Sequence, residues 1–195
     1  MKKNSKRSLA PIIICVLLAV LAALAFIVGR HLKGLYSRGM YPLAYQDELK
    51  AAADRYGLDR YFVAAVVCAE SRFRADAVSG AGAQGLMQVM PATAEWIAGM
   101  RGTEYEEGSL FDPETNLDYG CWLMRYLLDR YNGSERNALI AYNAGAGRLD
   151  GWLKDGADEN GELIEIPYSE TRAYVRKITQ LEERYRTEYE EALGS

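Results

Sequence analysis

The sequence predicts a mainly α-helical protein in which one domain follows an N-terminal transmembrane helix. Apolar residues recur three and four positions apart through most of the chain, which is the spacing of one helix face. Only the segment from Leu163 to Ile166 alternates with a period of two, so strand content should be minimal. Every residue from Ile12 to Val28 is apolar, and a helix of that length covers roughly 25 Å, enough for a short membrane span.

The 195 residues have a formal net charge of −4, but this charge is unevenly distributed. Residues 1–33 hold six of the 23 basic residues and none of the 27 acidic ones, so the rest of the chain has a net charge of −10. Because an acidic domain repels a polyphosphate chain, we expect no nucleic-acid partner. His31 is the one histidine, and the three cysteines form no C-x-x-C pair. We therefore expect no His-dependent catalytic triad, no metal site and no cofactor.

Residues 1–42 divide into three expected segments. Residues 1–11 form a basic cytoplasmic tail, residues 12–29 a transmembrane anchor, and residues 30–42 a tether that contains two glycines and Pro42. A cleaved signal peptide is the alternative to the anchor, since Ala23-Leu24-Ala25 has the form of a cleavage site. Both interpretations export the domain of residues 43–195. In the anchored case, the chain is a single-pass protein of the cell membrane with this domain on the extracytoplasmic side.

The first half of the domain predicts three helices. One runs from Leu43 to Tyr56 and ends at Gly57, and Asp59 caps a second that runs to about Arg72. A flexible Gly/Ala loop over residues 80–85 follows. Pro91 then begins the third helix, because proline suits the first helical position.

The second half predicts three more helices. Asp112 and Pro113 start one that ends before Asn132, and Ser134 starts another, which glycines at 145 and 147 break. A polar loop over residues 155–161 follows. Ser169 caps the last helix, in which four apolar residues repeat at helical spacing: Tyr174, Ile178, Leu181 and Tyr185.

Glu70 breaks the pattern of the second helix. Val63, Val66 and Val67 precede it by seven, four and three positions, so its carboxyl continues the apolar stripe. Desolvation disfavours the ionised form, which should raise the pKa of Glu70 and keep it protonated near neutral pH. Such an acid can donate a proton to a leaving group. A glutamate that turns outward at the helix end is the structural alternative.

Four short motifs occur in order along the chain, beginning at Glu70. They are ESRF at residues 70–73, GAQGLMQVMP at 82–91, AYNAG at 141–145 and ETRAYV at 170–175. Together they resemble the catalytic domain of the soluble lytic murein transglycosylases, the SLT domain, over roughly Leu43 to Leu181. The resemblance implies a lysozyme-like, largely helical fold. It also implies that peptidoglycan glycan strands are the substrate.

The resemblance also assigns roles to individual residues. It makes Glu70 the single catalytic acid and base, and it places the hydroxyl of Tyr142 on the carboxyl of Glu70. The other matched residues are expected to bind or support the glycan: Ser79, Leu86, Met87, Gln88, Asn143, Glu170 and Tyr174. A purely structural role is the alternative for each of them, in the core for Leu86, Met87 and Tyr174.

The reaction that the resemblance implies consumes no water. Glu70 first protonates the glycosidic oxygen of the β-1,4 bond between MurNAc and GlcNAc, and then takes the proton of the muramic acid 6-hydroxyl as a 1,6-anhydro ring closes. Most glycosidases need two carboxylates, and Asp76 is the nearest further one in the sequence. A hydrolytic muramidase on the same fold and a non-catalytic wall-binding module of a secretion or division complex are the alternatives. The sequence identifies no partner beyond glycan strands and the membrane.

Cys68 and Cys121 leave one question open. Outside the cytoplasm they could form a disulfide near Glu70. Two buried free thiols are the alternative.

Overall fold

The computed structural model describes residues 18–30 and 39–194, and the chain divides after Met40 into two units. Residues 18–30 are helical. No helix among the described residues is both long and apolar enough to cross a membrane. The predicted tail, residues 12–17 of the predicted anchor and residues 31–38 of the predicted tether lie outside the described residues.

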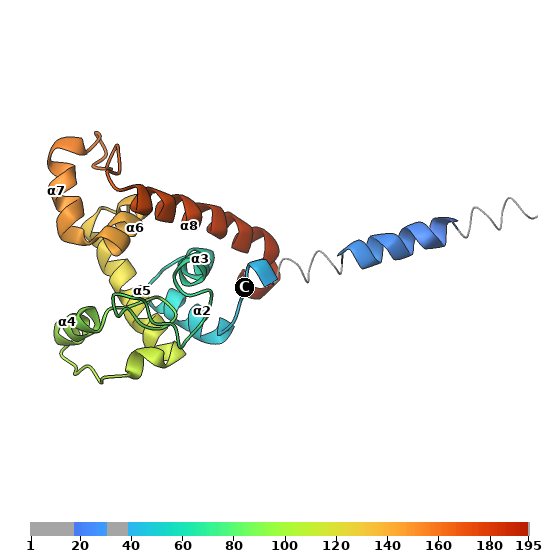
Figure 1. The fold of residues 1–195 in the computed structure, drawn as a ribbon, viewed down its shortest axis with the longest axis horizontal. Helices are drawn as coiled ribbons and strands as arrows, with labels where there is room; N and C mark the ends of the chain where they lie inside the picture. The colour runs from blue at the N-terminus through green and yellow to red at the C-terminus, as the bar shows by residue number, and fades with distance from the viewer. Residues whose placement is uncertain (1–17, 31–38, 195) are drawn as a thin grey trace, which may run out of the picture. The chain divides into compact units, whose positions relative to one another are not determined.

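The second unit is helical, as predicted (Figure 1). Within residues 41–194, β-pairing is limited to isolated bridges. The elements in chain order are α2 (Gln46–Arg55), α3 (Arg60–Glu70), α4 (Pro91–Arg101), the 3-10 helix η1 (Ser109–Phe111), α5 (Pro113–Arg130), α6 (Glu135–Ala144), α7 (Ala146–Gly156), α8 (Ser169–Glu188) and α9 (Glu190–Leu193).

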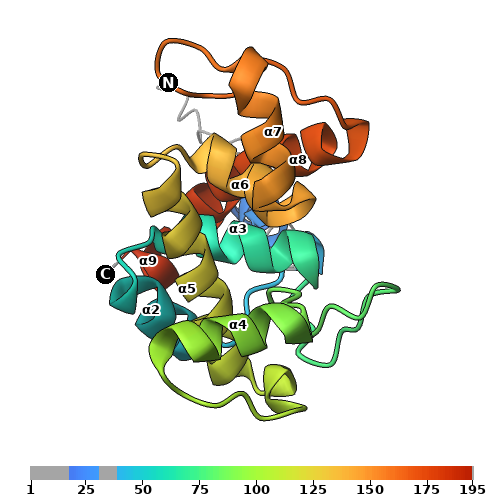
Figure 2. The same cartoon turned by 90° about the vertical axis from the view of Figure 1, so that its left-hand side faces the viewer.

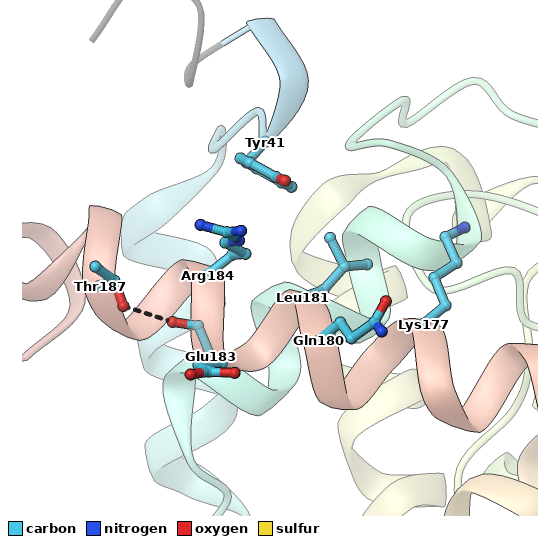
Figure 3. A pocket seen from close by; sticks show the side chains of 7 residues that line it. All are labelled: Tyr41, Lys177, Gln180, Leu181, Glu183, Arg184 and Thr187. Carbon is cyan, nitrogen blue, oxygen red and sulfur yellow. Dashed lines mark hydrogen bonds between the residues drawn. The ribbon is translucent and has the colours of Figure 1, made fainter. Parts of the chain in front are cut away.

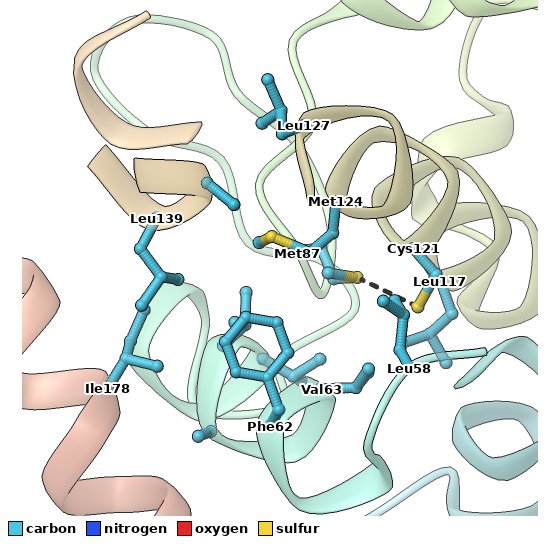
Figure 4. Close-up of a cluster of buried hydrophobic side chains, with 14 of the residues drawn as sticks. Leu58, Phe62, Val63, Met87, Leu117, Cys121, Met124, Leu127, Leu139 and Ile178 are labelled. Carbon is cyan, nitrogen blue, oxygen red and sulfur yellow. Dashed lines mark hydrogen bonds between the residues drawn. The ribbon is translucent and has the colours of Figure 1, made fainter. Parts of the chain in front are cut away.

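Helix α3 is the centre of this unit. All its residues from Tyr61 to Cys68 are buried, which is expected of a helix that is apolar on every side. Helix α8 packs along α3, and α5 packs on α2 and α6 (Figures 1 and 2). Side chains of α3, α5, α6 and α8 meet in one hydrophobic cluster that also contains Met87 (Figure 4).

The predicted helix starts are confirmed at three caps. Asp59 accepts hydrogen bonds from the amides of Tyr61 and Phe62, at 2.7 and 3.1 Å. Asp112 accepts one from the amide of Thr115, and Ser134 accepts one from that of Asn137: each cap satisfies an amide that has no partner within its helix.

Three predicted boundaries were wrong. Helix α2 starts at Gln46 because Tyr45 has a left-handed backbone, with φ 53°. Helix α3 ends at Glu70 because Arg72 and Phe73 have φ of 54° and 62°. Ser169 is the first residue of α8 rather than its cap, and no side-chain cap hydrogen bond forms at that end.

Helix α7 is not predicted by the sequence, because Gly147 and Gly151 weaken the local preference for a helix. Tertiary contacts supply what the local sequence lacks. Leu149 is fully buried, and Asp150 accepts a hydrogen bond from the hydroxyl of Tyr131 at 2.9 Å. Asp150 also forms an ion pair with Arg130 at 2.6 Å, which joins α7 to the end of α5.

The strand expected from Leu163 to Ile166 does not form. Leu163 makes one isolated bridge, with Ala157. Its backbone groups bind side chains instead: its amide donates to Asn137 Oδ1 at 3.1 Å, and its carbonyl accepts from the guanidinium of Arg136. These side chains satisfy the polar groups that a partner strand would otherwise bind.

Cys68 and Cys121 are free thiols in this structure, and both are buried. The Sγ atom of Cys121 lies 4.0 Å from Sδ of Met87, inside the hydrophobic cluster (Figure 4). The structure therefore supports the alternative of two free thiols over a disulfide.

Gly120 on α5 gives a test of packing at Met87. A Cβ added at Gly120 would lie 2.3 Å from Met87 Sδ and 2.7 Å from its Cβ. We expect Gly120→Ala to destabilise the domain by about 1–3 kcal/mol, since overpacking forces neighbours to move. At this size that lowers the melting temperature by about 3–10 °C in a thermal unfolding experiment.

Gly151→Ala on α7 is the matched control, because nothing lies within 4 Å of a Cβ at that helical glycine. It should stabilise the domain by about 0.5–1 kcal/mol, the helix preference of alanine over glycine. Equal melting temperatures for the two variants would contradict the packing described at Met87.

Candidate active site

The carboxyl of Glu70 stands at the end of the buried helix α3. Val63, Val66 and Val67, on the same helix face, are at most 1% exposed, and Glu70 itself is half-buried. Burial raises the pKa of Glu70 above its ordinary value, because an ionised carboxylate loses hydration there. The sequence-based prediction of a buried acid with a raised pKa is confirmed.

Two groups of α8 act on this carboxyl in the opposite direction. The hydroxyl of Tyr174 donates a hydrogen bond to Glu70 Oε1 at 2.5 Å. The ammonium of Lys177, one turn further along, donates to the carbonyl of Ala69 at 2.8 Å. The hydrogen bond and the positive charge both lower the pKa of Glu70, in part offsetting its burial. The carboxyl is therefore placed between an apolar environment, which favours the acid, and two groups that favour the anion.

The role expected for Tyr142 was wrong in one respect. Its hydroxyl donates to the carbonyl oxygen of Met87 at 2.7 Å and not to Glu70. Tyr142 still lies within electrostatic range of Glu70. Burial is the main cause of the raised pKa of the Tyr142 hydroxyl, and the charge of Glu70 raises that pKa further. Tyr174, expected to bind or support the glycan, instead donates its hydroxyl to the carboxyl.

The loop between α3 and α4 is fixed to the core by two buried polar side chains. The hydroxyl of Ser71 donates to the carbonyl of Leu86 at 2.8 Å. The amide of Asn116, on α5, accepts from the backbone N–H of Met87 at 2.7 Å and donates to the carbonyls of Gln84 and Leu110. Asn116 is fully buried, and all its hydrogen bonds go to backbone groups. This residue therefore sets the path of the loop beside Glu70.

Two backbone positions in the loop require special geometry. Gly85 has φ of 74°, and a Cβ there would lie 2.2 Å from Asn116 Nδ2 and from the carbonyl of Leu110, so only glycine fits. Gln88 also has a positive φ, of 50°, and its side-chain amide donates to the carbonyls of Ala77 and Gly85. Gln88 thus folds back on the loop that contains it.

The remaining residues expected to bind the glycan fall into two groups. Leu86 and Met87 have no exposed surface, so they support the site from the core and do not line a groove. The others keep exposed surface: Ser79 is half-buried and accepts a hydrogen bond from the amide of Ala83, while Glu170 and Asn143 are exposed. Asn143 accepts a hydrogen bond from Thr171 at 2.8 Å, which joins α6 to α8.

Two residues of the site, Asn116 and Lys177, were not predicted from the sequence. A signal existed for Asn116: it precedes Gly120 and Met124 by four and eight positions, so a polar residue lies on the buried stripe of α5. Lys177 has no comparable signal, because a lysine on an exposed helix face is ordinary. Only the packing of α8 on α3 brings it to Ala69.

The arrangement supplies one carboxyl for proton transfer. The charge that shifts the pKa of Glu70 within the described chain is that of Lys177, and no second carboxylate contributes. The described residues also contain no group of three or more His, Cys, Asp or Glu that could hold a metal ion. The site can thus give and take one proton at Glu70.

A family model, the transglycosylase SLT domain, matches residues 47–164, which is more than half of the sequence. The chain belongs to this family. The SLT fold is mainly helical and lysozyme-like, in agreement with the helical domain described above. The match ends before α8, so the helix that holds Glu70 through Tyr174 lies beyond it.

Relatives of known name agree with this assignment. The soluble lytic murein transglycosylase of Escherichia coli strain K12 is 33% identical over 171 residues, which cover 85% of this chain and 26% of that protein. The membrane-bound lytic murein transglycosylase C of Edwardsiella ictaluri is 32% identical, with 73% of this chain and 46% of that protein covered. This SLT chain thus spans about a quarter of the length of its soluble relative.

A solved structure is also similar. The crystal structure of the 70 kDa soluble lytic transglycosylase from Escherichia coli superposes with a TM-score of 0.70 at 31% identity. The match covers 77% of this chain and 25% of that one.

Tyr174→Phe tests which tyrosine holds the carboxyl. The lost hydrogen bond stabilises the ionised form, so its removal should raise the pKa of Glu70 further. We expect the side-chain carbon signal of Glu70 to titrate at higher pH in the variant than in the wild type, measured by carbon-13 NMR.

Tyr142→Phe is the matched control: it removes the same hydroxyl from a neighbouring tyrosine whose acceptor is a backbone carbonyl. Its Glu70 titration should follow the wild type more closely. A larger shift in Tyr142→Phe than in Tyr174→Phe would restore the role first expected for Tyr142.

Proposed function

We propose that this chain is a peptidoglycan lytic transglycosylase in which Glu70 acts first as a general acid and then as a general base. The single observation that carries the proposal is the buried carboxyl of Glu70, with its pKa raised and the hydroxyl of Tyr174 on Oε1. The names of its relatives in the SLT family support the choice of substrate.

In the first step, the protonated carboxyl gives its proton to the glycosidic oxygen as the bond from the muramic acid anomeric carbon to that oxygen breaks. Tyr174 occupies Oε1, so Oε2 is the oxygen free to carry the proton. In the second step the carboxylate takes the proton of the 6-hydroxyl while that oxygen bonds to the anomeric carbon. Protons balance, Glu70 returns to its acid form and no water is used.

The environment of Glu70 suits both steps. Burial favours the protonated form before the reaction, and the Tyr174 hydroxyl with the Lys177 charge stabilises the carboxylate between the two steps. A hydrolytic muramidase of the usual kind needs a second carboxylate within about 5–10 Å of the first. Besides burial, the groups that act on the pKa of Glu70 are Tyr174 and Lys177, so the proposal uses Glu70 as its single carboxyl.

Among the candidate glycan-binding residues, we propose that four bind the sugar or its acetamido groups: Ser79, Gln88, Tyr142 and Asn143. Each has a polar group and keeps some exposed surface. Glu170, in the first turn of α8, supports this edge of the site.

We also propose that residues 12–29 anchor the chain in the cell membrane with the SLT domain outside the cytoplasm. The apolar run from Ile12 to Val28 supports this, because a helix that is apolar on every side suits lipid better than water. The membrane-bound relative in Edwardsiella ictaluri agrees with a membrane location.

Digestion of purified peptidoglycan by the full chain, with mass spectrometry of the products, tests the activity. We expect muropeptides with 1,6-anhydro ends, lighter by one water than the products of a muramidase. Glu70→Gln should lower the rate by about 10³-fold, because an amide cannot transfer the proton. Products that carry the extra water would show that the chain is a hydrolase and not a transglycosylase.

Two controls separate loss of chemistry from loss of fold. Glu95→Gln makes the same change on the exposed face of α4 and should keep the wild-type rate. Burial raises the folded-state pKa of Glu70, so the folded state loses stability as the pH rises through that value. Since an amide has no such loss, the melting temperature of Glu70→Gln at neutral pH should be at least that of the wild type. Full activity in Glu70→Gln would rule out Glu70 as the catalyst, and a wild-type chain that binds peptidoglycan without cleaving it would be a wall-binding module.

Membrane fractionation tests the anchor. Replacing both Leu21 and Leu24 with Arg should release the chain from the membrane, since each change costs about 2.5–3.5 kcal/mol at a helix centre. Leu35→Arg, in the tether, should leave the chain membrane-bound. A mature chain that lacks residues 1–25 by mass would instead identify a cleaved signal peptide.

A further inference from the structure

Three arginines surround a hollow of about 530 Å³ beside helix α8, which we call the arginine hollow. Arg172 and Arg176 belong to α8, and Arg136 reaches the hollow from the first turn of α6. Glu165 is the one acid among the described residues of the lining. Three positive charges and one negative charge leave this lining with a net charge of +2.

The arginine hollow lies apart from the catalytic side of α8. Arg172 and Arg176 lie two residues before and two residues after Tyr174, whose hydroxyl binds Glu70. Each residue of a helix turns by about 100°, so two residues of separation place side chains about 200° apart around the axis. The two arginines therefore face away from the carboxyl, and the hollow does not belong to the site of cleavage.

Backbone carbonyls hold two of the three guanidinium groups in place. Nη2 of Arg136 donates to the carbonyl of Leu163 at 3.1 Å. Nη1 of Arg172 donates to the carbonyl of Pro167, also at 3.1 Å. Each guanidinium has five N–H groups, so both keep donors that no described residue accepts. A guanidinium that is already fixed loses little conformational entropy when it binds a ligand.

The domain does not neutralise the charge of the arginine hollow. Within the described part of the chain, none of its arginines forms an ion pair, although the chain after residue 33 is acidic. Unpaired cations that converge on one hollow attract an anion.

The number of donors favours phosphate over carboxylate. Three guanidinium groups offer more N–H donors than the roughly four acceptor positions of a carboxylate can use. A phosphate monoester has three free oxygens and a charge of about −1.5 to −2 at neutral pH. This charge matches the net charge of the lining, and guanidinium groups bind phosphate oxygens in pairs of parallel hydrogen bonds.

Apolar surface borders these cations. Ile164 lines the hollow with 68% of its surface exposed, and the buried Val175 adds a second apolar side chain. An ester carries an organic group that can cover this surface, whereas inorganic phosphate does not. We propose that the arginine hollow binds a phosphate ester, with its three guanidinium groups on the phosphate oxygens and the organic part against Ile164. Phospholipid headgroups and soluble glycerol phosphates share this chemistry.

The test is a titration of the full chain, in a nonionic detergent without phosphate and at constant ionic strength, with glycerol 3-phosphate. The side-chain NMR signals of the arginines report binding. We expect the signals of Arg136, Arg172 and Arg176 to shift together with one Kd. Unchanged signals for all three would overturn the proposal.

Arg176 is the residue to change, because its guanidinium, unlike the other two, holds no backbone carbonyl of the described chain. Arg176→Gln should raise the Kd about threefold to fivefold, as for loss of an exposed ion pair. Arg176→Lys should raise it less, because the charge remains.

Arg184→Gln is the matched control. It removes the same charge from the exposed surface of α8, but Arg184 lines a different hollow, next to Tyr41 (Figure 3). Its Kd should equal that of the wild type. Equal weakening in Arg176→Gln and Arg184→Gln would reduce the effect to general charge and overturn the proposal.

Two more anions test the class of ligand. Succinate carries two carboxylates and should bind at least threefold more weakly than glycerol 3-phosphate, as should inorganic phosphate. If succinate binds as tightly as the ester, the hollow does not select phosphate. If inorganic phosphate does so, the organic group contributes nothing. Either result overturns the phosphate-ester site.

A lipid arm distinguishes the sources of the ester. If short-chain phosphatidylglycerol in the micelles shifts the arginine signals at a lower concentration than glycerol 3-phosphate does, the ligand is a lipid headgroup. If glycerol 3-phosphate is at least as effective, the ligand is a soluble ester. Failure of every arm would leave the proposed cleavage reaction untouched, because the hollow faces away from Glu70.

Discussion

The hydrogen bond from Tyr174 to Glu70 is the interaction on which the site depends, because it joins the two helices that build the core to one reactive group. Helix α3 is buried almost throughout, so its last residue can only end in an apolar environment. Without a donor, the ionised form of a carboxyl there would be costly, and a freely solvated carboxyl would be ionised at neutral pH and have no proton to give. Packing of α8 on α3 supplies the donor and leaves the acid buried.

The segment after α3 shows how the fold fixes the surroundings of the carboxyl. The chain leaves the helix through two residues with positive φ, Arg72 and Phe73, and the loop that follows is bound to the core by Ser71 and Asn116. Gly85 and Gly120 make room for Asn116 and Met87. A polar side chain that binds only backbone groups can hold an irregular loop in one conformation. The loop motif of the family is therefore largely a packing motif, with Leu86 and Met87 turned into the core.

Helix α8 links the separate parts of the proposed function. It supplies the hydroxyl on Glu70 and the ammonium on Ala69. A helix is rigid over this length, so these groups keep fixed spacings of whole turns. This one helix therefore adjusts the proton affinity of the carboxyl through two groups that lie one turn apart.

The sequence alone determined the helical class, the starts of α3, α5 and α6, and the burial of Glu70, since caps and apolar periodicity act within a few residues. The tertiary structure decided which groups meet. Tyr174 and Glu70 are 104 residues apart, and the packing of α8 on α3 brings Tyr174 to the carboxyl, while Tyr142 of α6 donates to Met87 instead. Helix α7 and the side-chain-bound backbone at Leu163 likewise depend on contacts with α5 and α6. Local conformational preferences are weak compared with such packing. These tertiary contacts therefore could not be predicted from residues that are neighbours in the sequence.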